Sequence, residues 1–243
     1  MFEGVKINAL SALGYESQMT LYTMEQYFHE VWESIEDKIK KAQNEVIEED
    51  DETQVSMMSQ PHLSWVHESK DLFLKGVLVQ SYHALEDFLF LVSMLCRTKL
   101  NEPVPKKKRK NNLQRHLDYL KRVEGTIDKK INYDYYHEWS CMILKYASVR
   151  NCVVHDNSII QKEDTEPRTK KLRNVVQSDE RLDLVDFELK PYVEGEDQVK
   201  SERLVIKDRS FIKEQLKEFD LMIGMIVELL QLNHPSDSWK ITP

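Results

Sequence analysis

The sequence predicts a mainly α-helical protein, a bundle of four or five helices with a small β-hairpin inserted before the last helix. Glycine (6) and proline (7) make up 13 of the 243 residues, about 5%, where average usage gives roughly 12%. Scarce turn formers indicate few turns and therefore long elements, whereas a β-sandwich or barrel needs a turn every ~8–12 residues. Apolar residues also recur at helical spacing along several long segments.

The first predicted helix covers residues 16–49. Its apolar residues follow one another at intervals of three and four positions, which places them on one face of a helix. They are Met24, Phe28, Val31, Ile35, Ile39, Ala42 and Val46. The acidic run 48–52 ends this helix and is typical of a solvated segment.

The second predicted helix covers residues 64–98 and is apolar nearly all round between residues 77 and 95. A helix of this kind is expected in the middle of a bundle. His83 and Glu86 would then be polar groups in an apolar setting, where a charge costs several kcal/mol unless it is paired or solvated.

A basic run follows two prolines that break the chain after the second helix. Its five cations are Lys106, Lys107, Lys108, Arg109 and Lys110. Three interpretations stay open: a solvated loop, a contact to RNA phosphates, or a nuclear import signal. A short third helix is predicted over 113–124, where Gly125 is placed to terminate it.

The fourth predicted helix covers residues 133–154. Its apolar stripe consists of Tyr135, Trp139, Met142, Tyr146, Val149 and Val153. We expect the aromatic residues of this helix in the core or at an interface between copies of the chain.

The next segment, 161–208, changes character, because prolines and charges interrupt the helical pattern. Alternating apolar residues predict strands at 182–189 and 203–207, which would form the hairpin. The last helix, predicted over 210–232, should face inward with Phe211, Ile212, Leu216, Phe219, Ile223, Ile226 and Leu230. We therefore expect one helical domain over 1–243, with 161–208 as its insertion.

Several classes of function are excluded or disfavoured by composition. No two of the six glycines lie closer than ten positions, so the glycine-rich phosphate cradles of dinucleotide-binding and P-loop proteins are absent. Three dispersed cysteines fit a reduced, cytoplasmic chain. No segment has about 20 continuous apolar residues, so no membrane association is expected.

The most informative pattern is Arg150-Asn151-Cys152-Val153-Val154-His155, at the end of the fourth predicted helix. An Arg followed by four residues, the first of them Asn, and then His resembles the signature of HEPN domains. The helical bundle around it, with long helices before the motif and one after it, is similar to that family. The fold expected from the resemblance is a HEPN-like bundle, of the kind seen in the larger single-domain HEPN proteins of bacterial defence loci.

The residue types suit RNA cleavage independently of the resemblance. Arg carries a permanent charge in a planar fork that matches phosphate oxygens, and His exchanges protons near pH 6.5. Five positions on a straight helix correspond to about 500°, which would separate Arg150 and His155 by about 140°. They converge only if the helix ends or distorts near Val154, or if a second copy supplies the partner.

The resemblance implies a metal-independent endoribonuclease without a cofactor, with His155 and Arg150 as the catalytic pair. It also implies a homodimer with a composite active site, control by an antitoxin or sensor protein, and a role as a toxin or effector in antiviral defence. Asn151 would assist by binding the phosphate or His155. Glu86 is the candidate to orient Arg150.

Two alternatives stay open beside this hypothesis. Arg150 could be a surface cation, with His155 a helix-terminal histidine that interacts with the helix dipole. The chain could also be a catalytically silent HEPN-type module that binds RNA or scaffolds a defence complex, which the net charge of −8 mildly favours.

Overall fold

The computed structural model describes residues 8–48, 52–101, 112–123, 129–188, 200–234 and 236–240. These residues are mainly helical, as predicted, and include a small antiparallel sheet. The chain divides into two units, which we describe separately. Unit 1 comprises Met1–Tyr22, Gln80–Val149 and Glu214–Pro243, and unit 2 comprises Thr23–Val79 and Arg150–Lys213.

The elements agree with the predicted ones in type and order, with three additions. In chain order they are α1 (Ala9–Glu48), α2 (Glu52–Leu100), α3 (Asn112–Val123), α4 (Lys129–His155), β1 (Ile159–Gln161), α5 (Pro167–Ser178), β2 (Leu182–Glu188), β3 (Lys200–Ile206), α6 (Ser210–Asn233) and a 3₁₀ helix (Ser236–Trp239). The additions are α5, β1 and the 3₁₀ helix, so the described residues contain six α-helices where four or five were predicted. Pro167 was interpreted as an interruption, but it occupies the first turn of α5, where proline is favoured.

Helix α1 begins at Ala9, earlier than the predicted start at residue 16. Asn8 caps it, because its Oδ1 accepts hydrogen bonds from the backbone N–H groups of Leu10 and Ser11, both at 3.1 Å. The early start places Gly14 inside the helix.

In unit 1, α6 contacts three other helices. Phe219 of α6 lies edge-on to Tyr82 of α2 and to Tyr146 of α4, with ring centroids 6.4 and 5.5 Å apart. The Tyr146 hydroxyl also donates a hydrogen bond to Glu218 Oε2 at 2.6 Å. The inward face predicted for the last helix is confirmed, since all seven of its apolar residues are buried, five of them in unit 1 and Phe211 and Ile212 in unit 2.

Helix α1 approaches α6 closely at Gly14. A Cβ atom at this position would lie 2.6 Å from Val227 Cγ2, closer than real Cβ atoms approach. Nearby, Gln231 Nε2 donates a hydrogen bond to Ser11 Oγ at 2.6 Å. The lack of a side chain at Gly14 is therefore what lets these two helices pack.

Helix α3 is attached to α2 through a buried histidine. His116 Nδ1 lies 2.9 Å from Ser93 Oγ, and Ser93 donates its own hydroxyl proton to the Leu89 carbonyl at 2.7 Å. Arg115 Nη2 lies 3.3 Å from His116 Nε2. Because Arg can only donate, Nε2 accepts and the proton sits on Nδ1. Burial, with a smaller effect from the Arg115 charge, lowers the pKa of His116 to about 4.

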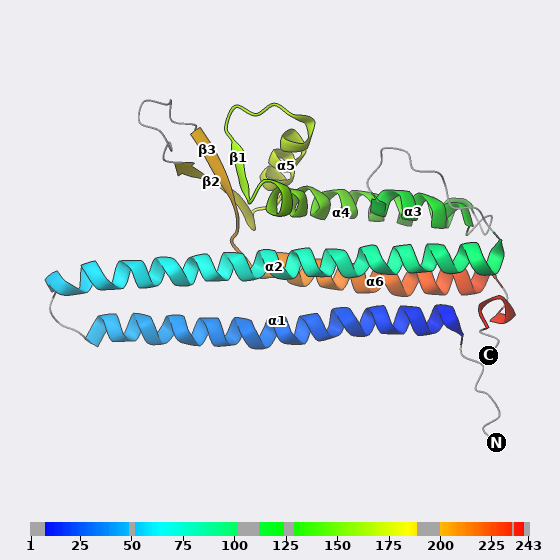
Figure 1. The fold of residues 1–243 in the computed structure, drawn as a ribbon, viewed down its shortest axis with the longest axis horizontal. Coiled ribbons are helices and arrows are strands. Elements are labelled where there is room, and N and C mark those ends of the chain that lie inside the picture. The colour runs from blue at the N-terminus through cyan, green and yellow to red at the C-terminus, as the bar shows by residue number, and fades with distance from the viewer. Residues whose placement is uncertain are drawn as a thin grey trace, which may run out of the picture. The chain divides into compact units, whose positions relative to one another are not determined.

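In unit 2, a three-stranded antiparallel sheet has the order β1-β3-β2, and α5 packs beside it (Figure 1). The predicted hairpin is confirmed as β2 and β3, paired from Leu182 with Ile206 to Glu188 with Lys200. Elsewhere in this unit, Phe28 of α1 stacks on Phe73 of α2, with centroids 5.7 Å apart.

Two predicted faces differ from the structure. Helix α2 has an exposed side that includes Phe90, Leu91 and Met94, and His83 is exposed while Glu86 is half-buried. A sequence that is apolar all round cannot reveal which of its sides faces outward. On α4, Tyr136 is buried in place of Tyr135, which is 38% exposed. Within the described ranges, no helix is long and apolar enough to cross a membrane.

We predict that Gly14→Ala destabilises the protein, although alanine favours helices. The new methyl group would overlap Val227, whose β-branched side chain has little rotamer freedom. Overpacking costs about 1–3 kcal/mol, more than the gain of about 1 kcal/mol from helix propensity. Gly76→Ala is the matched control, because nothing lies within 4 Å of its Cβ position. Urea denaturation should show a lower free energy of unfolding for Gly14→Ala and a higher one for Gly76→Ala. A gain for both would contradict the close approach.

We also predict that acid weakens the fold through His116. Its pKa is about 4 in the folded chain and about 6.5 when unfolded, so between these values only the unfolded chain binds the proton. The free energy of unfolding should therefore fall as the pH decreases from 6.5 to 4, by up to about 3 kcal/mol. His116→Asn, which keeps a donor near Ser93 but does not titrate, should flatten this dependence. His137→Asn, at an exposed histidine, should leave it unchanged; equal slopes in all three proteins would refute the assignment.

Candidate functional site

The candidate site lies in unit 2, where α4 ends and the chain turns into β1. The Cys152 carbonyl accepts hydrogen bonds from the N–H groups of Asp156 and Ser158, at 3.1 and 2.9 Å. Asn157 and Ser158 adopt positive φ angles of 50° and 66°, a left-handed conformation that a helix cannot continue through. A turn therefore follows the motif, and it stops the helix at His155.

Arg150 and His155 meet within a single chain. Arg150 Nη1 lies 3.4 Å from His155 Nε2, a long hydrogen bond, and 3.1 Å from Asn151 Oδ1. The angular separation on an ideal helix is overcome because His155 is the last helical residue and the long arginine side chain reaches it. Of the two ways to bring the pair together, the structure shows the first, an end of the helix near Val154.

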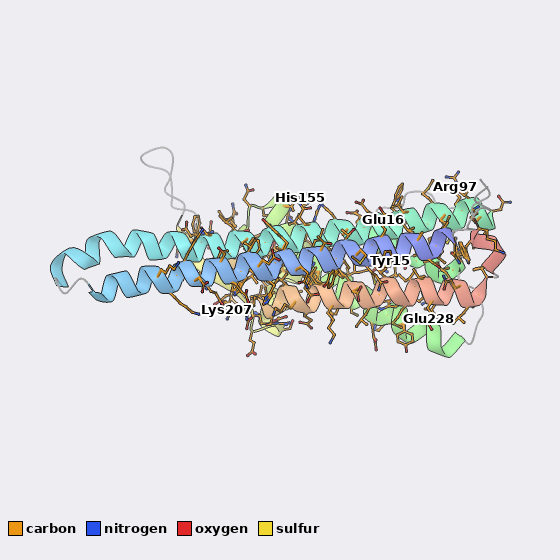
Figure 2. All side chains as sticks on the ribbon, turned by 90° about the horizontal axis from the view of Figure 1, so that it is seen from below. Tyr15, Glu16, Arg97, His155, Lys207 and Glu228 are labelled. Carbon is orange, nitrogen blue, oxygen red and sulfur yellow. The ribbon has the colours of Figure 1, made fainter. Side chains whose placement is uncertain are left out.

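The hydrogen bond between the pair has one possible direction. The guanidinium has donors only, so Arg150 Nη1 donates and His155 Nε2 accepts. His155 and Asn151 are exposed, and Arg150 is half-buried; Figure 2 labels the His155 side chain. The three residues thus form a small, accessible group with one fixed cation and one imidazole.

Backbone hydrogen bonds attach the turn to the central strand of the sheet. Leu204 of β3 donates its N–H to the Ser158 carbonyl at 2.7 Å, directly before β1 pairs with β3 at Ile159 and Arg203. The position of His155 is therefore linked to β3 through a turn of three residues.

Beyond Ser158, no described strand pairs with the β1 side of β3, and two charged residues of α2 contact it instead. The N–H and C=O groups of alternate residues on a strand point to the same side, so Leu204 and Ile206 face this side together. Lys75 Nζ donates to the Leu204 carbonyl at 2.5 Å, and Ile206 donates its N–H to Asp71 Oδ1 at 3.1 Å. Asp71 and Lys75 complete the edge of the strand.

Asp71 and Lys75 also pair with each other in the interior. Their side chains are joined at 2.5 Å, and the residues are only 6% and 3% exposed. Arg203 adds a second cation 3.6 Å from Asp71 Oδ2. Burial lowers the pKa of Lys75, against which the hydrogen bond and charge of Asp71 act in the opposite direction.

Sequence analysis missed this pair, although a signal was present. Residues 71 and 75 have the i, i+4 spacing of a helical ion pair at the start of the most apolar stretch of the second helix. Arg168 was likewise not placed near the motif. It lies 3.2 Å from Asp156 Oδ1, next to His155 in the sequence, and 3.0 Å from Glu166 Oε2.

Cys152, between the two motif residues, belongs to the core. It is 2% exposed, and burial, with a smaller effect from Asp156, raises the pKa of its thiol to about 12. A thiol in this state is not a nucleophile.

The structure does not test the remaining predicted site residues. Glu86 belongs to unit 1 and Arg150 to unit 2, so the predicted orienting role of Glu86 stays a prediction. The basic run from Lys106 to Lys110 lies outside the described residues. On α4, Cys141 Sγ and His137 Nε2 are 3.9 Å apart, but no described group of three or more His, Cys, Asp or Glu residues is arranged to hold a metal ion.

Comparison of the chain with protein-family models, with curated proteins and with solved structures finds no match.

Proposed function

We propose that the protein is a metal-independent endoribonuclease whose catalytic residues are Arg150 and His155. The observation that carries the proposal is their contact at 3.4 Å on an exposed helix end, with Asn151 beside them. A permanent cation and a neighbouring imidazole are the minimal catalytic groups needed for a 2′-hydroxyl to attack the adjacent phosphodiester.

The proposed reaction begins when a phosphate attracts the guanidinium. Arg150 then binds the phosphate oxygens in place of His155 Nε2, which frees that nitrogen to accept a proton. His155 takes the proton of the 2′-hydroxyl while the 2′-oxygen attacks phosphorus, and Arg150 stabilises the added negative charge. The bond from phosphorus to the 5′-oxygen breaks, and this oxygen takes a proton from water. The products are a 2′,3′-cyclic phosphate and a 5′-hydroxyl.

Asn151 has a supporting part in this proposal. Its Oδ1 accepts from Arg150, which restrains the guanidinium, while its amide N–H groups are donors available to a phosphate oxygen. We further propose, from the resemblance to HEPN domains, that two copies form a composite site and that an antitoxin or sensor controls the activity. A role as a toxin or effector in antiviral defence belongs to the same proposal.

The alternative function is a catalytically silent HEPN-type module that binds RNA or scaffolds a defence complex. One observation favours it: in the free chain, His155 Nε2 is occupied by Arg150, so the base is not yet available. The two functions differ in whether RNA is cut.

We predict that purified protein cuts RNA in the presence of EDTA and leaves cyclic phosphate ends. Arg150→Ala and His155→Ala should each slow cleavage by about 10²-fold or more, because each removes a charge or proton-transfer contribution of that size. The matched controls are Arg97→Ala and His137→Ala, which remove the same residue types at exposed positions of α2 and α4 and should cut at the wild-type rate.

Mapping the product ends over time with the five proteins tests the proposal. Cleavage that survives in both site variants would refute the assignment of the two residues. Binding of RNA without any cleavage would favour the silent module.

A further inference from the structure

Helix α5 has a composition unlike the rest of the chain. Its sequence, PRTKKLRNVVQS, contains four cations and no acidic residue, in a protein whose net charge is −8. We propose that Arg168, Lys170 and Lys171, which we call the α5 cation surface, bind the phosphodiester backbone of single-stranded RNA beside the Arg150 and His155 site. That RNA is the ligand rests on the proposed function.

The opposite side of α5 is used to fix the helix. Thr169 and Leu172 are buried, and Thr169 Oγ1 donates to Asp164 Oδ2 at 2.7 Å. Arg173 pairs with Glu202 of β3 and donates to the carbonyls of Gln161 and Lys162, at 3.1 and 3.0 Å. One of the four cations is therefore structural, and the helix is held rigidly enough to present the other three.

The three remaining cations are open to solvent. Arg168 has a side chain that is 60% exposed, and Lys170 and Lys171 are exposed. Among the side chains that the structure describes, neither lysine ammonium has an ion pair or a hydrogen bond. Lysines on a rigid helix without internal partners can exchange bound counterions for phosphates, and the release of those ions drives binding.

The surface lies next to the proposed catalytic pair. Arg168 contacts Asp156, the residue directly after His155, at 3.2 Å. Lys171 follows Arg168 at i+3, and residues three apart are neighbours on the same side of a helix. An RNA strand bound along this side of α5 is thereby placed beside the turn that carries His155. Lys170 lies about 100° round the helix from Lys171, so it extends the surface away from the turn that carries Asp156.

The acidic residues near the α5 cation surface do not neutralise its positive charge. Glu166 and Asp156 both pair with Arg168, so this arginine must exchange partners to bind a phosphate. Asp164 accepts hydrogen bonds from Thr169 and from the Glu166 backbone. None of these acids pairs with Lys170 or Lys171. We therefore expect the two lysines to contribute most of the affinity.

The test measures binding without cleavage. The probe is a fluorescent single-stranded 2′-O-methyl oligonucleotide of about 20 nucleotides, a length that exceeds one typical binding site. Its blocked 2′-oxygens cannot attack phosphorus. The full chain is titrated by fluorescence anisotropy at several salt concentrations, as wild type, as Lys170→Gln/Lys171→Gln, and as Lys38→Gln/Lys40→Gln. The last variant removes two exposed lysines from α1 and matches the change in net charge.

We expect the α5 variant to lose roughly tenfold in affinity at low salt. The slope of log Kd against log salt should fall by about 1.4, since each phosphate contact to a single strand contributes about 0.7. The α1 variant should keep the wild-type slope. Equal slopes for all three proteins, equal losses in both variants, or no binding by the wild type would each overturn the inference.

These outcomes are independent of the cleavage experiment. If the protein does not cut RNA but binding depends on the α5 lysines, the inference holds and the proposed nuclease fails. If the protein cuts RNA and binding is unchanged in the α5 variant, the nuclease stands and the inference fails.

Discussion

The buried ion pair between Asp71 and Lys75 is the interaction on which unit 2 depends. A buried pair alone adds little stability, because the cost of removing two charges from water offsets their attraction. Here each charge also satisfies a backbone group of β3 that no strand in the described residues pairs, the Leu204 carbonyl and the Ile206 N–H. A buried backbone group without a partner costs about 1–3 kcal/mol, so the pair is required by the edge that it completes.

The geometry of the proposed site depends on this ion pair and its contacts to β3. Leu204 accepts from Lys75 and donates to Ser158, and Ser158 belongs to the left-handed turn that ends α4. The end of the helix in turn lets Arg150 reach His155. Four links therefore connect a charged pair in the interior to an imidazole at the surface. The function proposed for Arg150 and His155 depends on their being held together, and each link is a hydrogen bond or a backbone constraint.

Local patterns in the sequence predicted most elements, and their failures have physical causes. The inward face of α6 was predicted residue by residue, because apolar spacing on a helix with one buried face is unambiguous. Helix α5 was missed because Pro167 can either break a helix or begin one. On α4, Tyr135 was predicted on the buried face, but Tyr136 is the buried residue. Two adjacent tyrosines fit either face of a helix, so the sequence could not separate them. The meeting of Arg150 with His155 depends on where the helix ends, and the groups of β3 that Asp71 and Lys75 contact lie more than a hundred residues away. No local pattern contains either fact.

Amide hydrogen exchange in Lys75→Met, compared with wild type, tests the central role of the buried pair most directly. Methionine keeps the apolar stem but leaves the Leu204 carbonyl without its donor and Asp71 without its nearest cation. The account predicts that the amides of Ser158, Leu204 and Ile206 exchange at least about tenfold faster, which corresponds to about 1.4 kcal/mol of lost local stability. Amides of α6 between residues 219 and 226, in unit 1, should keep their protection. Wild-type exchange rates at Leu204 and Ile206 would show that the strand edge does not need the pair and would contradict the account.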